Sequence, residues 1–226
     1  MSYDYLGLVN DVCGRLNETQ LTSSNFSDAI AIYTQIKESV NASMRHINQS
    51  HYNWPFNHVE ETMTLSAGVA RYAIPFDAKV LDFETFRIRR DTTLDVGNAR
   101  RLKPLSYDEY VDLHIDQEDE TDTSKGSVPE CIVRSQSEEF ILYPFPDKAY
   151  ELTFEYFTVP ADLVNVTDVP RIPERFRHVI VDGAMYYAYM FRDNLESATI
   201  AQRKFDEGVK DMRTLLTNEY FYIRAV

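Results

Sequence analysis

The sequence predicts an α+β fold, in which an antiparallel bundle of four helices carries an inserted domain of antiparallel β-structure. Near both ends of the chain, apolar residues recur every three or four positions, as on one face of a helix. In the middle they alternate with polar residues, which is typical of half-buried strands. The predicted parts are a first helical part (1–56), a β-rich insert with one short helix (57–170), a second helical part (171–217) and a tail (218–226).

Two helices are predicted in the first helical part. The first is short, and its apolar face is formed by Leu6, Val9, Cys13 and Leu16. The second has Ser27 as its predicted N-cap, because a hydroxyl there accepts a hydrogen bond from a free N–H group of the first turn. It is expected to end near Tyr52, before Pro55, and its apolar face is formed by Ala29, Ile32, Ile36, Val40, Met44 and Ile47.

Two long helices are predicted in the second helical part. Pro173 suits the first position of a helix, where its missing N–H costs nothing. The face that follows is formed by Phe176, Val179, Ile180, Ala184, Tyr187 and Phe191. Asp193-Asn194 breaks this pattern, which resumes with Ala198, Ala201, Phe205, Val209, Met212 and Leu216. Two long helices joined by so short a turn are expected to pack antiparallel.

The β-rich insert is predicted to begin with a hairpin. Residues 63–66 and 72–75 alternate between apolar and polar side chains, and Gly68 between them predicts a turn. Further strands are predicted at 131–133, 140–143 and 152–156. A short helix is predicted over residues 106–116, with Tyr107, Tyr110, Val111 and His114 on one side.

A strand predicted after this hairpin contains a change of side-chain parity. Leu81 and Phe83 lie on one side of a regular strand, whereas Phe86 and Ile88 would lie on the other. We therefore predict a β-bulge or sharp bend near Glu84-Thr85.

Two charged segments of the insert are interpreted as solvent-exposed. The segment 117–127 is polar and acidic and contains Gly126, so it is predicted to be an exposed, mobile loop. The basic cluster of Arg87, Arg89 and Arg90 is interpreted as a solvated strand end rather than a binding site.

The charge of the chain limits its partners. Its 226 residues carry a formal net charge of −13. Affinity for DNA or RNA depends on Lys and Arg, so specific binding of nucleic acid or of an anionic membrane is not expected. A protein partner with a basic face fits this charge, and so does a surface that must not hold DNA.

The cysteines and the apolar runs indicate a cellular compartment. Cys13 and Cys131 lack the CxxC spacing, which predicts free thiols in a reducing environment. There is no basic and apolar leader pattern at the N-terminus, and no apolar run approaches the roughly 20 residues that span a membrane. We expect a soluble, cytosolic protein without a membrane segment.

The sequence lacks the motifs of common catalytic and metal sites. An EF-hand loop beginning at Asp116 would need Gly at position 121 and Glu at position 127, where the chain has Thr121 and Ser127. No HxxxH or HExxH pair is formed by His46, His51, His58, His114 and His178. There is no GxSxG, GxGxxG or GxxxxGK[ST] motif either. We predict no enzyme, no cofactor and no metal.

Several short sequences occur in a fixed order between residues 28 and 215. They are Asn53-Trp54-Pro55-Phe56, Gly68, Tyr72-Ala73-Ile74-Pro75, Leu102-Lys103-Pro104-Leu105-Ser106 followed by Tyr110, Leu142-Tyr143-Pro144-Phe145-Pro146-Asp147, Tyr156, Ile172-Pro173-Glu174-Arg175-Phe176 and Gly183-Ala184. In order and spacing this string resembles the adaptor, or head-completion, proteins of tailed bacteriophages, which connect the head to the tail.

The resemblance implies a structural virion protein of the neck, assembled in the host cytoplasm. It implies a ring, usually a dodecamer, that binds under the portal, extends the DNA channel and offers a platform for tail or nozzle proteins. Packaged DNA would pass through without specific binding. The resemblance also implies portal contact by the C-terminal segment, here Tyr220, Phe221, Tyr222, Ile223 and Arg224. A disordered tail is the alternative for these residues.

Two other functions stay open at this point. Any two of the 36 acidic residues could meet in a cleft as the paired carboxylates of a cell-wall glycosidase. The chain could also be a cytosolic scaffold module unrelated to phage.

Overall fold

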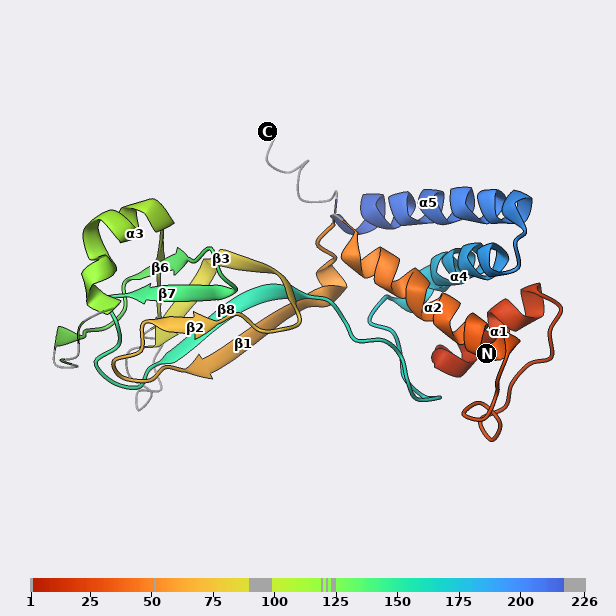
Figure 1. Ribbon diagram of the computed structural model, residues 1–226, viewed down its shortest axis with the longest axis horizontal. Helices are drawn as coiled ribbons and strands as arrows, with labels where there is room; N and C mark the ends of the chain where they lie inside the picture. The colour runs from red at the N-terminus through yellow and green to blue at the C-terminus, as the bar shows by residue number, and fades with distance from the viewer. Residues whose placement is uncertain are drawn as a thin grey trace. The chain divides into compact units, whose positions relative to one another are not determined.

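The computed structural model describes residues 2–50, 52–89, 99–118, 120, 122 and 125–217. Within these residues there are five α-helices and eight β-strands, which confirms the α+β class (Figure 1). The chain divides into two compact units. The helical unit is Met1–Asn57 with Val159–Val226, and the β unit is His58–Thr158. Residues 159–170, which the sequence assigned to the insert, thus belong to the helical unit.

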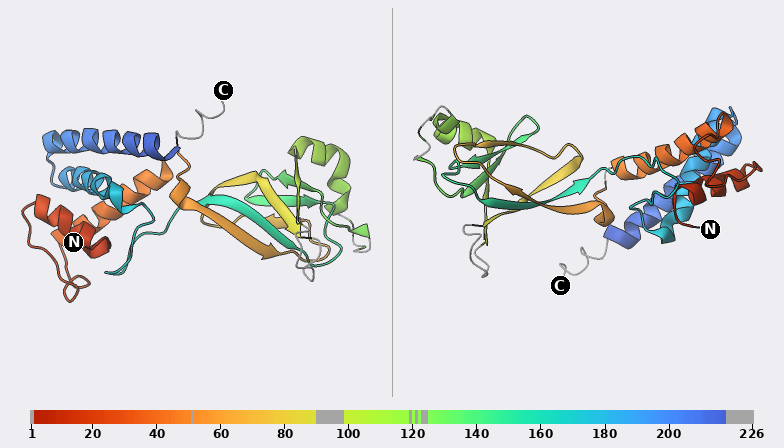
Figure 2. Two further views of the ribbon diagram at one scale, coloured as in Figure 1. Left: turned by 180° about the vertical axis from the view of Figure 1, so that it is seen from behind. Right: turned by 90° about the horizontal axis from the view of Figure 1, so that it is seen from below.

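The helical unit contains four of the α-helices and two short 3-10 turns. The helices are α1 (Tyr5–Arg15), α2 (Ile32–Gln49), α4 (Arg177–Phe191) and α5 (Leu195–Thr217). The 3-10 turns are Pro55–Asn57 and Glu174–Phe176. Figure 2 shows α2, α4 and α5 packed side by side. The buried apolar side chains of this unit form one core, which includes Leu8, Ile36, Trp54, Ile180 and Phe205.

The start of α2 differs from the prediction. Its N-cap is Ala31, which has a φ of 58° and no side-chain cap, so the assignment of Ser27 as N-cap is wrong. Residues 22–26 form a turn instead, which buries Phe26 against the ring of Tyr5. Burial of this aromatic ring outweighs a capping hydrogen bond worth about 1 kcal/mol.

The two C-terminal helices run antiparallel, as predicted (Figure 1). Their connection turns at Asp193, which has a φ of 56°, and Asn194 accepts a hydrogen bond from the backbone N–H of Ser197. Pro173 is not the first residue of α4. It precedes the 3-10 turn that leads into the helix.

The β unit contains two four-stranded sheets. The first sheet has the order β1-β8-β3-β4, formed by β1 (His58–Thr64), β8 (Glu151–Thr158), β3 (Ala78–Arg89) and β4 (Ala99–Arg101). The second has the order β2-β7-β6-β5, formed by β2 (Arg71–Ala73), β7 (Glu139–Tyr143), β6 (Cys131–Arg134) and β5 (Lys103–Leu105). All described pairings are antiparallel except β5 with β6. The strands at 131–133, 140–143 and 152–156 are confirmed, whereas β4 and β5 were not predicted.

The predicted hairpin at 63–75 is wrong. β1 pairs with β8, and β2 pairs with β7 in the other sheet. The segment between β1 and β2 crosses from one sheet to the other, and Gly68 has a φ of 77° in its turn. Its Leu65 is buried between the sheets, which a tight hairpin turn would not allow.

The predicted bulge in β3 is confirmed. Asp82 lies opposite Glu155 and Arg87 lies opposite Thr153, so β3 has extra residues between these two pairs. The Thr85 hydroxyl holds the bulge, because it donates to the Asp82 carbonyl (2.7 Å) and accepts from the Glu155 N–H (3.0 Å). Beyond the bulge, Phe86 is fully buried.

The β unit is layered. Side chains of both sheets form one core between them, including Phe86, Phe140, Leu142, Leu152 and Phe154. The helix α3 (Tyr107–His114) and the 3-10 turn Ile115–Glu118 cover the other face of the second sheet. A small cluster of Tyr110, Val133 and Ile141 lies beneath this helix.

Candidate functional site

The C-terminal residues that the resemblance assigns to portal contact lie outside the described part of the chain. They are Tyr220, Phe221, Tyr222, Ile223 and Arg224, and they follow the last described residue of α5.

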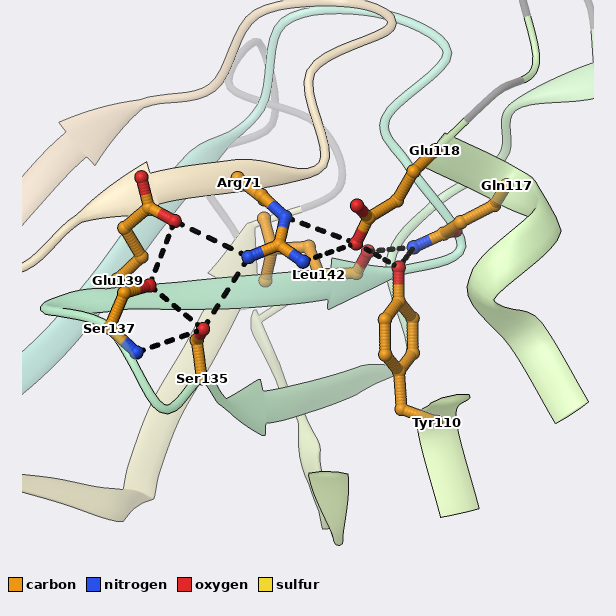
Figure 3. A network of polar contacts seen from close by, with 8 residues as sticks. All are labelled: Arg71, Tyr110, Gln117, Glu118, Ser135, Ser137, Glu139 and Leu142. Atoms are coloured by element: carbon orange, nitrogen blue, oxygen red, sulfur yellow. Dashed lines mark hydrogen bonds and ion pairs between the residues drawn. The ribbon is translucent and has the colours of Figure 1, made fainter. Parts of the chain in front are cut away.

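A polar network around Arg71 joins α3 and its 3-10 turn to the second sheet (Figure 3). Arg71, at the start of β2, donates from Nε (3.0 Å) and Nη2 (2.8 Å) to Oε1 of Glu118. Its Nη1 reaches Ser135 and Glu139 at 3.4 Å. The hydrogen bonds that Arg71 donates to Glu118 raise the pKa of Arg71, so the guanidinium stays charged. Arg71 thus binds residues that lie 47 and 68 positions further along the chain, Glu118 and Glu139.

Tyr110 forms the other half of this network. Its ring is fully buried, and its hydroxyl donates to Glu118 (2.9 Å) and accepts from Nε2 of Gln117 (3.0 Å). Gln117 also donates to the Leu142 carbonyl (3.1 Å) in β7. Burial raises the pKa of Tyr110 to about 12, so its hydroxyl keeps its proton at neutral pH.

The network corrects the interpretation of a mobile loop at Gln117 and Glu118, with which the segment 117–127 begins. Gln117 and Glu118 belong to the 3-10 turn, and their side chains are fastened to the sheet. Gly126 is closely packed, because a Cβ there would lie 2.6 Å from the ring of Phe145. The sequence could not reveal the Arg71–Glu118 pair, since the partners are far apart along the chain and neither belongs to a motif.

The outer face of α3 combines carboxylates with exposed apolar side chains. Asp108, Glu109 and Asp112 are exposed on the helix. Among them Val111, Leu113 and Ile115 are 38%, 67% and 36% exposed. Val111, which the sequence assigned to the same side as Tyr110, thus faces solvent. His114 is on the predicted side and stacks on Tyr143 with ring centroids 3.9 Å apart.

The outer face of the first sheet carries paired charges. Arg87 donates to Glu60 (2.7 Å) and Glu155 (3.2 Å). Arg89 lies 3.5 Å from Glu151. Within the predicted basic cluster, glutamates therefore balance the charges of Arg87 and Arg89. Arg90, the third member, lies outside the described residues. Such a face offers no excess positive charge to a phosphate backbone.

Among the described residues, no set of three His, Cys, Asp or Glu side chains could hold a metal ion. A glycosidase needs a general acid with a raised pKa. A hydrogen bond from Lys125 instead lowers the pKa of Glu120. Hydrogen bonds from the backbone N–H groups of Val164 and Asn165 lower the pKa of Asp168. Neither fits that role.

The two cysteines are free thiols. Cys13 is buried in the core of the helical unit, as expected, and burial raises its pKa to about 11. Cys131 is only partly buried, and burial raises its pKa as well. No helix in the described ranges is both long and apolar enough to cross a membrane.

Comparison with known protein families identifies a match that covers most of the chain. A family model described as SU10 adaptor protein matches residues 3–222, which is nearly the whole chain. No curated protein matches the chain.

Proposed function

This chain belongs to the SU10 adaptor protein family, and on that basis we propose that it connects the head of a tailed phage to its tail as a ring under the portal. Family membership is the observation that carries this proposal. It supports a structural role in the neck of the virion rather than catalysis.

In this proposal about twelve copies form the ring and extend the DNA channel, and their outer surfaces receive tail or nozzle proteins. The distribution of charge supports a conduit for DNA. Residues 58–158 contain 21 acidic and 11 basic residues, a net charge of −10, so most of the negative charge of the chain lies in the β unit. A wall of that sign repels the phosphate backbone and lets DNA pass without being held. Assembly would take place in the host cytoplasm.

We assign portal contact to the C-terminal segment that contains Tyr220, Phe221, Tyr222, Ile223 and Arg224. Aromatic residues and arginine are enriched in the buried centres of protein interfaces, and this short segment has both. In the sequence it follows α5, which ends at Thr217.

The proposal is tested with purified portal protein. The full chain and a variant truncated after Thr217 are each mixed with portal rings and examined by electron microscopy and sedimentation. We expect the full chain to add a second ring to the portal and the truncated chain to bind at least about tenfold more weakly, which corresponds to a loss of 1.4 kcal/mol or more.

The fluorescence of Trp54, the single tryptophan, shows whether the truncated chain is still folded, because its indole is buried in the helical unit. A full chain that never binds portal would overturn the adaptor assignment. A folded, truncated chain that binds as tightly as the full chain would overturn only the role of the C-terminal segment.

A further inference from the structure

A basic cavity lies on the helical unit beside α1 and α4. Its volume is about 460 Å³, and it is lined by Asp11, Arg15, Arg175, Arg177, His178 and Val181. Three arginines and a histidine at one place are unusual for a chain with a net charge of −13. Such a cavity suits a partner that brings carboxylates.

Part of this positive charge is already neutralised within the unit. Nε of Arg177 donates to Asp11 (2.5 Å), and Arg15 pairs with Asp182. Arg175 differs, because it is exposed and makes no ion pair with any described residue. Its guanidinium lies 4.9 Å from the centre of the Phe176 ring, which is itself buried. A planar guanidinium fixed in this way can bind a carboxylate through two parallel hydrogen bonds.

The outer face of α3 offers the complementary charge. Residues 104–124 contain eight acidic residues and neither Lys nor Arg. Asp108, Glu109 and Asp112 are exposed on the helix around the apolar side chain of Leu113. The Arg71–Glu118 network fastens this helix to the sheet, so the face is rigid before it meets a partner. A rigid face loses less conformational entropy on binding than a mobile one.

We propose that the basic cavity of one copy binds the acidic face of α3 on the next copy. The inference rests on the proposed ring. Subunits that each carry −13 repel one another, so a contact between copies needs a place where opposite charges meet. The two surfaces are different, which makes the contact heterologous, and heterologous contacts repeat around a closed ring.

Charge reversal tests this contact. Arg175→Glu changes the cavity, Asp112→Lys changes the helix face, and Arg203→Glu on the exposed surface of α5 is the control. Ring formation on portal is followed by electron microscopy, and self-association by sedimentation at high protein concentration. We expect each of the first two variants to associate at least about tenfold more weakly, because like charges then face each other. The control should assemble like the original chain.

Two combinations separate this contact from a general loss of charge balance. A chain with both Arg175→Glu and Asp112→Lys should regain ring formation, since the charges are exchanged across the contact. An equimolar mixture of the two single variants should also form rings, in which the two variants alternate. The intact cavity of one variant then meets the intact α3 face of the other, and the two changed surfaces, which have exchanged charges, meet each other. Failure of the double variant to assemble better than either single variant overturns the inference.

The outcomes also distinguish this inference from the proposed function. Portal rings formed equally well by the original chain and by Asp112→Lys would refute the contact and leave the adaptor role standing. Loss of tail-protein binding by Asp112→Lys, with rings intact, would assign α3 to a tail protein and refute the contact between copies. Absence of rings from the original chain would refute the proposed ring itself.

Discussion

Gly183 on α4 lies against the ring of Phe205 on α5 so closely that a Cβ on Gly183 would be 2.7 Å from Cε2 of the ring. The hydroxyl of Ser43 on α2 contacts the same point and donates to the Ile180 carbonyl (2.9 Å). Three helices of the helical unit therefore meet at a glycine, and the missing side chain sets how closely they pack.

We expect Gly183→Ala to destabilise the helical unit. The added methyl group must displace the Phe205 ring or the Ser43 side chain, and such overpacking costs about 1–3 kcal/mol. This loss exceeds the gain of about 0.4–1 kcal/mol that Ala usually brings to a helix. Unfolding in urea, followed by the fluorescence of buried Trp54, measures the effect on this unit.

Gly14→Ala is the matched control. Gly14 also lies in a helix, α1, but the nearest atom to a Cβ there is Nε2 of Gln20 at 3.9 Å. Without a clash, the substitution should stabilise the protein by about 0.4–1 kcal/mol. Equal effects of the two substitutions would show that packing at Gly183 is not critical.

Tyr110→Phe should weaken the attachment of α3 to the second sheet. The ring stays buried, but Glu118 loses one donor and Gln117 loses one acceptor. A hydrogen bond to a charged group contributes about 1.5–3 kcal/mol, and the partial exposure of Glu118 reduces this to about 1–2 kcal/mol. Amide hydrogen exchange in residues 105–118 would report the loss.

Tyr143→Phe tests whether the hydroxyl of Tyr110 is responsible. Tyr143 stacks on His114, and no described residue forms a hydrogen bond with its side chain. Its replacement should change exchange in α3 by less than the equivalent of about 0.5 kcal/mol. A similar loss in both variants would mean that the ring positions, rather than the network, hold α3.

The features that the sequence predicted correctly depend on neighbours along the chain. The bulge at Glu84-Thr85 followed from side-chain parity, because a regular strand cannot change faces without an extra residue. The antiparallel pair α4 and α5 followed from two apolar faces and the short break at Asp193.

The features that it missed depend on residues far apart. The predicted hairpin failed because β1 pairs with β8, whose residues lie about 90 positions later, rather than with its neighbour β2. Ser27 failed as a cap because the burial of Phe26 keeps the backbone before α2 in a turn. The site around Arg71 was unpredictable for the same reason, since no local pattern joins it to Glu118 or Glu139.

The two thiols should react at different rates. The thiolate is the nucleophile, and burial raises the pKa of Cys13 to about 11, so little thiolate is present at pH 8. Cys131 is only partly buried, although burial raises its pKa too. Alkylation with iodoacetamide at pH 8, followed by mass spectrometry, should modify Cys131 first. In denaturant both should react at one rate, and faster labelling of folded Cys13 would contradict the burial described.

The loop at residues 164–168 should make stability depend on pH through Asp168. Its carboxylate accepts from the backbone N–H groups of Val164 (2.8 Å) and Asn165 (2.7 Å), which lowers its pKa in the folded state. A carboxyl that binds its proton less readily when folded stabilises the protein above its unfolded pKa of about 3.9. This stabilisation is lost as the pH falls through the folded value.

Asp168→Asn should therefore lower the melting temperature at pH 7, and the difference from the original chain should shrink as the pH falls from about 4 to about 2. Thermal unfolding followed by Trp54 fluorescence measures it, since both residues belong to the helical unit. Asp206→Asn, on the exposed surface of α5, is the control and should leave the melting temperature nearly unchanged at each pH. A constant difference between Asp168→Asn and the original chain down to pH 2 would show that the side-chain charge is not what stabilises this loop.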